Sequence, residues 1–128
     1  LAPSVMLFLS PTTTTRKLDT MFSYTITIGR NVGTEPMSAE RWEEFKASVA
    51  ADFNLVVNGF QAGVGQWEEF YGNGVWEDTP EDSFKVTVLL EEELPKDRLD
   101  QLRRYLSENA RLFAQDAIAL TIGVSELC

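Results

Sequence analysis

The residues of this chain that could do chemistry are carboxylates, a group of aromatic side chains and an arginine, because histidine is absent and cysteine occurs once. Without histidine, Ser-His-Asp and Cys-His catalysis are excluded, as are zinc, iron or copper sites with imidazole ligands. The one cysteine, Cys128, ends the chain, which excludes an internal disulfide and a sulfur-rich metal site. A carboxylate site for magnesium or calcium stays open, but we assign no catalytic residue, no metal site and no cofactor.

The carboxylates come mostly as adjacent residues. A catalytic pair needs two carboxyl groups held apart in a cleft with different pKa values. Neighbouring residues on a strand point to opposite faces, and the cluster from Glu77 to Asp82 lacks the spacing of an EF-hand loop. We therefore interpret the carboxylates as a solvated acidic surface, made of Glu43 and Glu44, Glu68 and Glu69, Glu77 and Asp78, Glu81 and Asp82, and Glu91 to Glu93.

Four aromatic residues crowd around an expected hairpin tip at Gly72-Asn73-Gly74. Asn-Gly favours a tight turn because it tolerates positive φ, and side chains near such a tip lie far from a core. Trp and Tyr are the favoured anchors of binding interfaces. We predict that this group binds a second copy or a ligand, with simple packing against the sheet as the alternative. The group comprises Trp67, Phe70, Tyr71 and Trp76.

Arg30 is the remaining candidate, because it directly follows the first expected strand. An arginine at a strand end can hold an anionic ligand through two parallel hydrogen bonds. The competing interpretation is a surface ion pair with one of the many carboxylates, which is the commoner arrangement. Arg30 joins the aromatic group as a predicted binding residue.

Two kinds of periodicity define the elements that must position these residues. Helical spacing of apolar residues covers residues 39–52, where Ser38 is the expected N-cap, and a second helix that starts at Pro95 and ends near Phe113. Alternation of apolar and polar residues is typical of half-buried strands. The strands with this alternation are residues 22–28, 84–90 and 118–124.

The pattern of apolar residues in the middle of the chain predicts a further strand and one arm of a hairpin. Leu55-Val56-Val57 resumes strand character directly after the first helix. An arm from Phe60 to Tyr71 leads to the expected tip, and the return begins with Val75 and Trp76. An acidic bend from Glu77 to Asp82 then connects the hairpin to the next strand.

The order strand, helix, strand, strand, helix, strand predicts a ferredoxin-like βαββαβ fold, an α+β class in which two helices cover one face of a four-stranded antiparallel sheet. Residues 21–128 form this single domain, and residues 1–20 are expected to be a flexible leader or extension. The apolar run from Val5 to Leu9 is too short to span a membrane and lacks the positive start of a signal peptide, which favours a cytoplasmic location. The rival interpretation makes this run an extra edge strand or a partner-binding arm.

The balance of acidic and basic residues limits the classes of binding partner that we expect. The chain has 128 residues and a formal net charge of −9, with 20 acidic residues against 11 basic ones. Direct binding of nucleic acid rests on cationic contacts to phosphate, so it is disfavoured, and so are anionic membrane surfaces. A basic partner protein fits this balance, and plain solubility is the commoner reason for an acidic surface.

Short segments resemble a family of small bacterial α+β proteins whose function is not established. These segments are Ile28-Gly29-Arg30, Ser38 to Phe45 with Trp42, Gly65-Gln66-Trp67 and Ser83 to Val88, and the similarity spans residues 24–124. The resemblance implies a fold type and little chemistry. Many members of the family are exported, whereas this chain lacks a convincing signal peptide. A compact, acidic, phage-encoded protein would also have these features.

Three functions are compatible with these patterns. The first is a non-enzymatic binding or interaction protein that acts as a homodimer through the aromatic hairpin, with room for a small-molecule ligand. The second is an acidic inhibitor, encoded by a phage, that occupies the nucleic-acid-binding groove of a basic partner protein. The third is an enzyme that uses carboxylates together with Arg30, which ranks last because histidine and a usable cysteine are missing.

Overall fold

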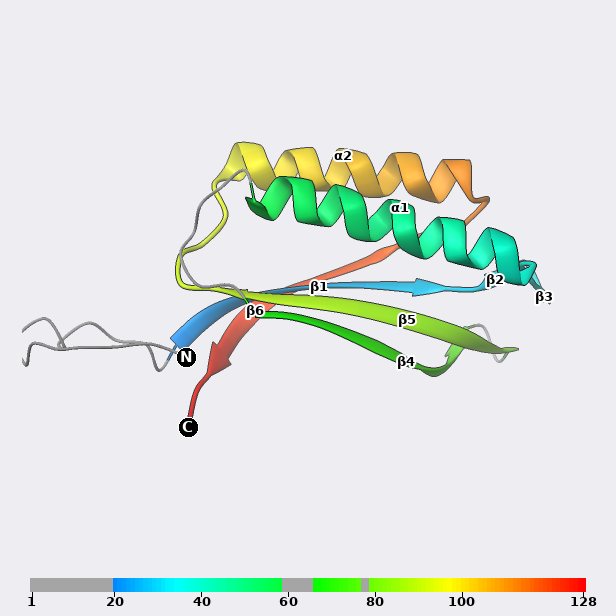
Figure 1. The fold of residues 1–128 in the computed structure, drawn as a ribbon, viewed down its shortest axis with the longest axis horizontal. Coiled ribbons are helices and arrows are strands. Elements are labelled where there is room, and N and C mark those ends of the chain that lie inside the picture. Colours follow the sequence, from blue (N-terminus) through cyan, green and yellow to red (C-terminus); the bar gives the residue numbers. More distant parts are fainter. Residues whose placement is uncertain (1–19, 59–65, 77–78) are drawn as a thin grey trace, which may run out of the picture.

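The computed structural model describes residues 20–58, 66–76 and 79–128, with the backbone alone for residues 66–76, 79 and 80 (Figure 1). Most of the expected leader therefore lies outside the described residues, and the division into residues 1–20 and 21–128 stays a prediction. The elements in chain order are β1 (Thr20–Gly29), β2 (Asn31–Val32), β3 (Glu35–Pro36), α1 (Ala39–Asn58), β4 (Gln66–Trp76), β5 (Thr79–Leu90), α2 (Lys96–Leu112) and β6 (Ala119–Glu126).

The molecule has two layers, a sheet and a pair of helices. The sheet has the strand order β4-β5-β1-β6, and every neighbouring pair of strands is antiparallel. Both helices lie on the same side of it (Figure 1). The prediction of a mixed α+β domain with two helices and an antiparallel sheet is confirmed. The short strands β2 and β3 form a separate small hairpin, which turns at Gly33 with a φ of 64°.

The core lies between the sheet and the helices because alternate residues of the two central strands are apolar. Tyr24, Ile26 and Ile28 of β1 are buried and stand opposite residues of β5 that are also buried. Helix α1 adds Phe45, which stacks on Phe113 with ring centroids 4.7 Å apart. The other largest fully buried side chains are Phe53, Leu90, Leu102, Val49, Val56, Val86 and Val88.

Helix α1 begins where the sequence predicts but ends later. The Ser38 hydroxyl accepts a hydrogen bond of 3.1 Å from the Arg41 N–H, which is the expected cap. The prediction that Leu55-Val56-Val57 forms a strand is wrong, because α1 runs to Asn58. Val56 and Val57 continue the helical spacing of Val49 and Phe53 and are buried, so helical packing outweighs the strand preference of valine.

The predicted turn at Gly72-Asn73-Gly74 is also wrong. These residues lie inside β4, where Asn73 pairs with Asp82 of β5, and the pairing continues to Trp76 opposite Thr79. A reversal at residues 72–74 would forfeit the ladder hydrogen bonds that this longer pairing provides. The expected acidic bend is correspondingly strand from Thr79 onward. Residues 77–78 and the first part of the expected arm, residues 60–65, lie outside the described residues.

Helix α2 packs on α1 through a polar contact that the apolar pattern does not reveal. Asn109 is 4% exposed and donates a 2.8 Å hydrogen bond to the Asp52 carboxylate of α1. Its amide oxygen accepts a 2.6 Å hydrogen bond from the Ser48 hydroxyl. Both ends of the buried amide are therefore satisfied, and this fixes the register of the two helices.

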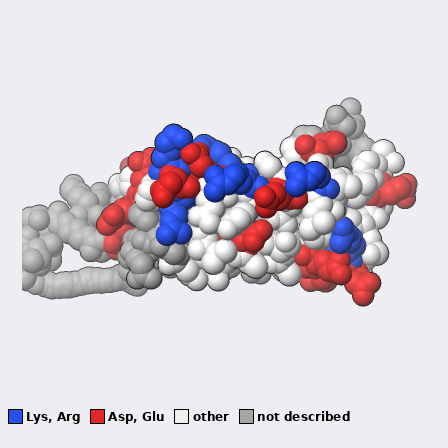
Figure 2. All heavy atoms as spheres, turned by 90° about the horizontal axis from the view of Figure 1, so that it is seen from above, with Lys and Arg blue, Asp and Glu red and all other residues white. Residues whose placement is uncertain are grey.

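The outer side of the helices carries charges of both signs next to one another (Figure 2). Asp100 contacts Lys96 at 2.7 Å and Arg103 at 3.2 Å. The hydrogen bond from Lys96 is the main reason that the pKa of Asp100 lies below its ordinary value. Within the ranges that the structure describes, neither helix is long and apolar enough to cross a membrane. The cytoplasmic location stays a prediction.

Candidate functional site

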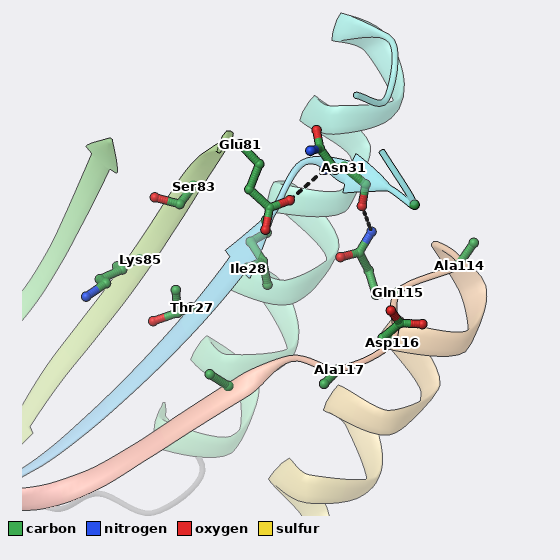
Figure 3. A pocket seen from close by; sticks show the side chains of 13 residues that line it. Thr27, Ile28, Asn31, Glu81, Ser83, Lys85, Ala114, Gln115, Asp116 and Ala117 are labelled. Carbon is green, nitrogen blue, oxygen red and sulfur yellow. Dashed lines mark hydrogen bonds between the residues drawn. The ribbon is translucent and has the colours of Figure 1, made fainter. Parts of the chain in front are cut away.

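A pocket of about 460 Å³ opens where β1 ends. Its walls come from the end of β1, the β2–β3 hairpin, the first part of β5, the turn after α2 and the start of β6 (Figure 3). Its volume falls in the range of small-molecule sites. The lining residues are Thr27, Ile28, Gly29, Asn31, Gly33, Glu81, Ser83, Lys85, Ala114, Gln115, Asp116, Ala117 and Ala119.

Gly29 makes room for a carboxylate at the edge of this pocket. A Cβ atom at Gly29 would overlap the carboxylate of Glu81, so a residue with a side chain at this position would displace the Glu81 carboxylate from its present place. Gly29 pairs with Ser83, two residues beyond Glu81 on β5. Because Gly29 has no side chain, the Glu81 side chain can lie over the end of β1.

A chain of hydrogen bonds connects three of the pocket walls (Figure 3). The Glu81 carboxylate accepts a hydrogen bond of 2.9 Å from the backbone N–H of Asn31. The carbonyl oxygen of Asn31 accepts one of 2.9 Å from the side-chain amide of Gln115. Strand β5, the β2–β3 hairpin and the turn after α2 are therefore held at fixed distances from one another, which gives the pocket a defined shape.

The end of α2 determines where the turn residues point. Ala114 has a φ of 56°, in the left-handed region. The Gln115 N–H donates to the Ala110 carbonyl at 2.7 Å, and the Ala114 N–H donates to the Arg111 carbonyl at 3.3 Å. This is the pattern of a Schellman cap, although an alanine stands where glycine is usual. The cap ends the helix sharply and directs Gln115 and Asp116 to the pocket.

The pocket combines charges of both signs with an apolar wall. Glu81 and Asp116 supply two carboxylates, and Lys85 supplies one ammonium group. Ile28, Ala117 and Ala119 add apolar surface, and the hydroxyl groups of Thr27 and Ser83 add neutral polar contacts. The arrangement suits a small ligand that carries both positive and negative groups. Among the described residues, no cluster of acidic or cysteine side chains could hold a metal ion.

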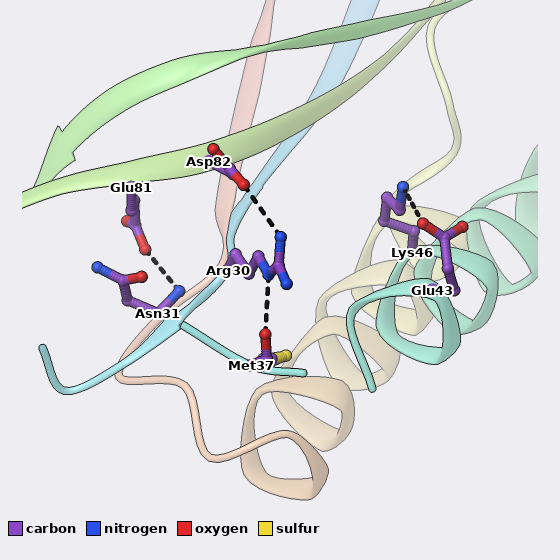
Figure 4. Close-up of polar contacts among 7 residues, drawn as sticks. All are labelled: Arg30, Asn31, Met37, Glu43, Lys46, Glu81 and Asp82. Carbon is purple, nitrogen blue, oxygen red and sulfur yellow. Dashed lines mark hydrogen bonds and ion pairs between the residues drawn. The ribbon is translucent and has the colours of Figure 1, made fainter. Parts of the chain in front are cut away.

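Arg30 lies beside this pocket but is not part of its lining (Figure 4). Its Nε donates a 2.8 Å hydrogen bond to the Met37 carbonyl, and its Nη1 lies 3.2 Å from the Asp82 carboxylate. The Arg30 guanidinium thus ties the end of the β2–β3 hairpin to β5. These contacts correspond to the predicted alternative of an ion pair, and binding of an anionic ligand by Arg30 stays a prediction.

The predicted aromatic group lies on β4, where the structure describes the backbone alone. In register, Trp67 pairs with Val88, Phe70 with Lys85, and Tyr71 with Phe84. Trp76 ends the strand opposite Thr79. Their side chains lie outside the described residues, so the predicted binding role of these four residues stays a prediction.

The pocket residues escaped prediction because they come from separate segments without a shared motif. Glu81 belongs to a run of acidic residues that predicts a solvated surface, and Gln115 and Asp116 lie in a connection that shows no periodicity. One signal was available once β1 and β5 are paired. The register places Gly29 beside the Glu81–Ser83 segment, and a glycine at the end of a central strand often marks a close approach by another group.

Comparison with solved structures finds this fold in a phage lyase of S-adenosylmethionine (SAM). Its complex with S-methyl-5′-thioadenosine aligns with a TM-score of 0.51 at 18% identity, over 84% of this chain and 83% of that chain. Its apo state aligns with a TM-score of 0.53 at 20% identity, over 88% and 87%. At these identities the likeness shows the fold alone. No protein-family model and no curated protein matches the chain, and the resemblance to a bacterial family stays a prediction.

Proposed function

We propose that this chain is a small phage-type enzyme that binds SAM in the pocket at the end of β1 and releases S-methyl-5′-thioadenosine. The observation that carries the proposal is the charge of the pocket. SAM bears a sulfonium, an ammonium and a carboxylate, that is, two positive groups and one negative group. Glu81, Asp116 and Lys85 present the opposite set at the pocket lining. The fold shared with a phage SAM lyase supports the same proposal.

The chemistry suits a chain that lacks histidine. Release of S-methyl-5′-thioadenosine requires cleavage of the bond between sulfur and the four-carbon amino acid part of SAM. The bonding electrons stay on sulfur, which becomes a neutral thioether. The carbon that leaves sulfur takes its new bond from the carboxylate oxygen of the same amino acid part, which closes a lactone, so no oxidant, reductant or further reactant is needed. The positive charge on sulfur disappears in this step.

The sheet and the two helices also suggest a fold type. The main elements follow the order strand, helix, strand, strand, helix, strand, with the sheet order β4-β5-β1-β6. We assign this arrangement to the ferredoxin-like type. Fold type alone does not determine function. The fold supports the proposal only because it places the pocket at the end of β1.

The alternative is a non-enzymatic binding protein. Such a protein would hold a ligand in the same pocket, or associate with a second copy, without turning the ligand over. The acidic-inhibitor alternative draws on the net charge of −9. On the side of the molecule that the helices cover, basic and acidic side chains lie next to one another (Figure 2). That side therefore offers no purely acidic surface for binding a basic partner.

Product analysis separates these functions. Purified protein is incubated with SAM, and the mixture is resolved by reversed-phase chromatography with mass detection. We expect SAM to decrease and S-methyl-5′-thioadenosine to increase by the same amount. S-adenosylhomocysteine, a neutral thioether, is the control and stays intact because it has no sulfonium leaving group. Binding of SAM without product would favour the non-enzymatic alternative, and the absence of both binding and product would refute the proposal.

A further inference from the structure

Strand β6 forms an edge of the sheet and exposes apolar side chains there. No strand lies on its outer side among the residues that the structure describes. Ile122 is 44% exposed and Val124 is 64% exposed. They stand opposite Tyr24 and Phe22 of β1, so they lie on the helix-covered face of the sheet. The helices nevertheless leave both side chains open to solvent.

Strand β6 has little of the protection that usually prevents an edge strand from pairing with another chain. Edge strands are usually protected by charged residues, by proline or by a bulge. The one charged residue of β6 is Glu126 at its end, and residues 117–125 contain no charged residue and no proline, in a chain whose residues are 24% charged. Two copies that each carry a charge of −9 repel one another. The uncharged stretch of residues 117–125 is therefore a surface where they can approach without placing like charges opposite each other.

We infer that β6 pairs with β6 of a second copy, antiparallel about a two-fold axis through Gly123, so that the two sheets join edge to edge. Residues directly opposite in such a pair share one face of the sheet. In this register Ile122 faces Val124 of the partner subunit on both sides of the axis. A register shifted by two residues in either direction would place Glu126 of one subunit opposite Ile122 or Ile118 of the other, that is, a carboxylate opposite an apolar side chain.

The pairing also brings the second copy to the pocket. With Gly123 on the axis, Leu127 of the partner subunit stands opposite Ala119, which lines the pocket together with Ala117. Leu127 is 45% exposed in the single chain. The partner subunit then adds an apolar group at the β6 side of the pocket. The pairing itself does not depend on the proposed reaction.

Cysteine cross-linking tests the register. Cys128 is first replaced by Ser, and Gly123→Cys is then compared with the matched variant Thr121→Cys on the same strand and face. A Cβ atom at Gly123 lies 3.4 Å from the Ser23 hydroxyl, an ordinary contact, so the substitution fits the fold. On mild oxidation we expect Gly123→Cys to form a disulfide-linked dimer. The two cysteines of Thr121→Cys would lie ~13 Å apart, since each strand residue spans about 3.3 Å, which is too far for a disulfide.

Association without cysteine chemistry supplies the second test. Sedimentation of the full chain is expected to give a dimer, which Val124→Lys dissociates by placing ammonium groups in the interface. Val32→Lys, at another exposed valine on β2, is the control and leaves the dimer intact. A monomer at all concentrations would overturn the inference, including the case in which residues 1–19 of the same chain cover the edge. Equal cross-linking of Gly123→Cys and Thr121→Cys would overturn the register. Neither measurement involves SAM, so a failure here is distinct from a failure of the proposed function.

Discussion

Replacing Phe45 with alanine is expected to lower the free energy of unfolding by ~3–5 kcal/mol. The Phe45 side chain is fully buried, stacks on Phe113 and meets Trp42 edge to face with centroids 6.1 Å apart. Alanine would leave a cavity between α1 and the end of α2, where Phe113 also lies beneath the Arg41 guanidinium at 4.2 Å. This loss is comparable with the whole stability of many small domains.

Urea denaturation followed by tryptophan fluorescence measures the effect. Leu55→Ala is the matched control, because Leu55 lies on the same helix but is 58% exposed, and we expect it to change the free energy by less than about 0.5 kcal/mol. Phe45→Leu is expected to fold with an intermediate loss, so it provides a value even if Phe45→Ala does not fold. A loss of less than ~1 kcal/mol for Phe45→Ala would contradict the described core.

Replacing Glu81 with glutamine is expected to weaken SAM binding by about tenfold to a hundredfold. The variant keeps the shape of the side chain and an oxygen that can accept the Asn31 N–H, which lies 2.9 Å from the carboxylate. It removes the negative charge that would face the positive groups of SAM. A hydrogen bond to a charged group contributes ~1.5–3 kcal/mol, and each 1.4 kcal/mol corresponds to about tenfold in affinity.

Isothermal titration calorimetry with SAM measures this effect, and product release should fall in parallel. Glu92→Gln is the control, because Glu92 is an exposed carboxylate that does not line the pocket. The two variants have the same net charge, so a general electrostatic effect would weaken both equally. Equal affinity of Glu81→Gln and the unmodified protein would remove Glu81 from the site.

The parts of the fold that the sequence predicts correctly are those with strong local periodicity. In β1, Tyr24, Ile26 and Ile28 alternate with polar residues, and burial follows this alternation. The cap at Ser38 and the apolar face that begins at Trp42 predict helix α1, and the structure has both. These signals act within a few residues, so they can be read without knowledge of the rest of the chain.

The errors occur where distant contacts decide the local structure. The valines at the end of α1 have strand propensity, yet Val56 is fully buried on the helix because the core extends that far. Asn73 would suit a turn, yet it pairs with Asp82 because the ladder between β4 and β5 continues. Neither outcome is encoded in the neighbouring residues alone.

The pocket could not be predicted for the same reason. Gly29, Glu81 and Gln115 are separated by many residues in sequence, and each is unremarkable in its own segment. Their relation arises only when β1 pairs with β5 and the cap at Ala114 turns Gln115 toward Asn31. The sequence does limit the chemistry, since the lack of histidine leaves carboxylates, ammonium and guanidinium groups, hydroxyls and amides as the available groups.

Titration of the ¹⁵N-labelled protein with SAM, followed by backbone amide shifts, tests most directly the claim that this pocket is the ligand site. We predict saturable shifts at Thr27, Asn31, Ser83 and Gln115, and unchanged shifts at Ala50, which lies on α1 away from the pocket lining. Saturable shifts confined to other parts of the chain would place the ligand elsewhere. No shifts at millimolar SAM would contradict binding altogether.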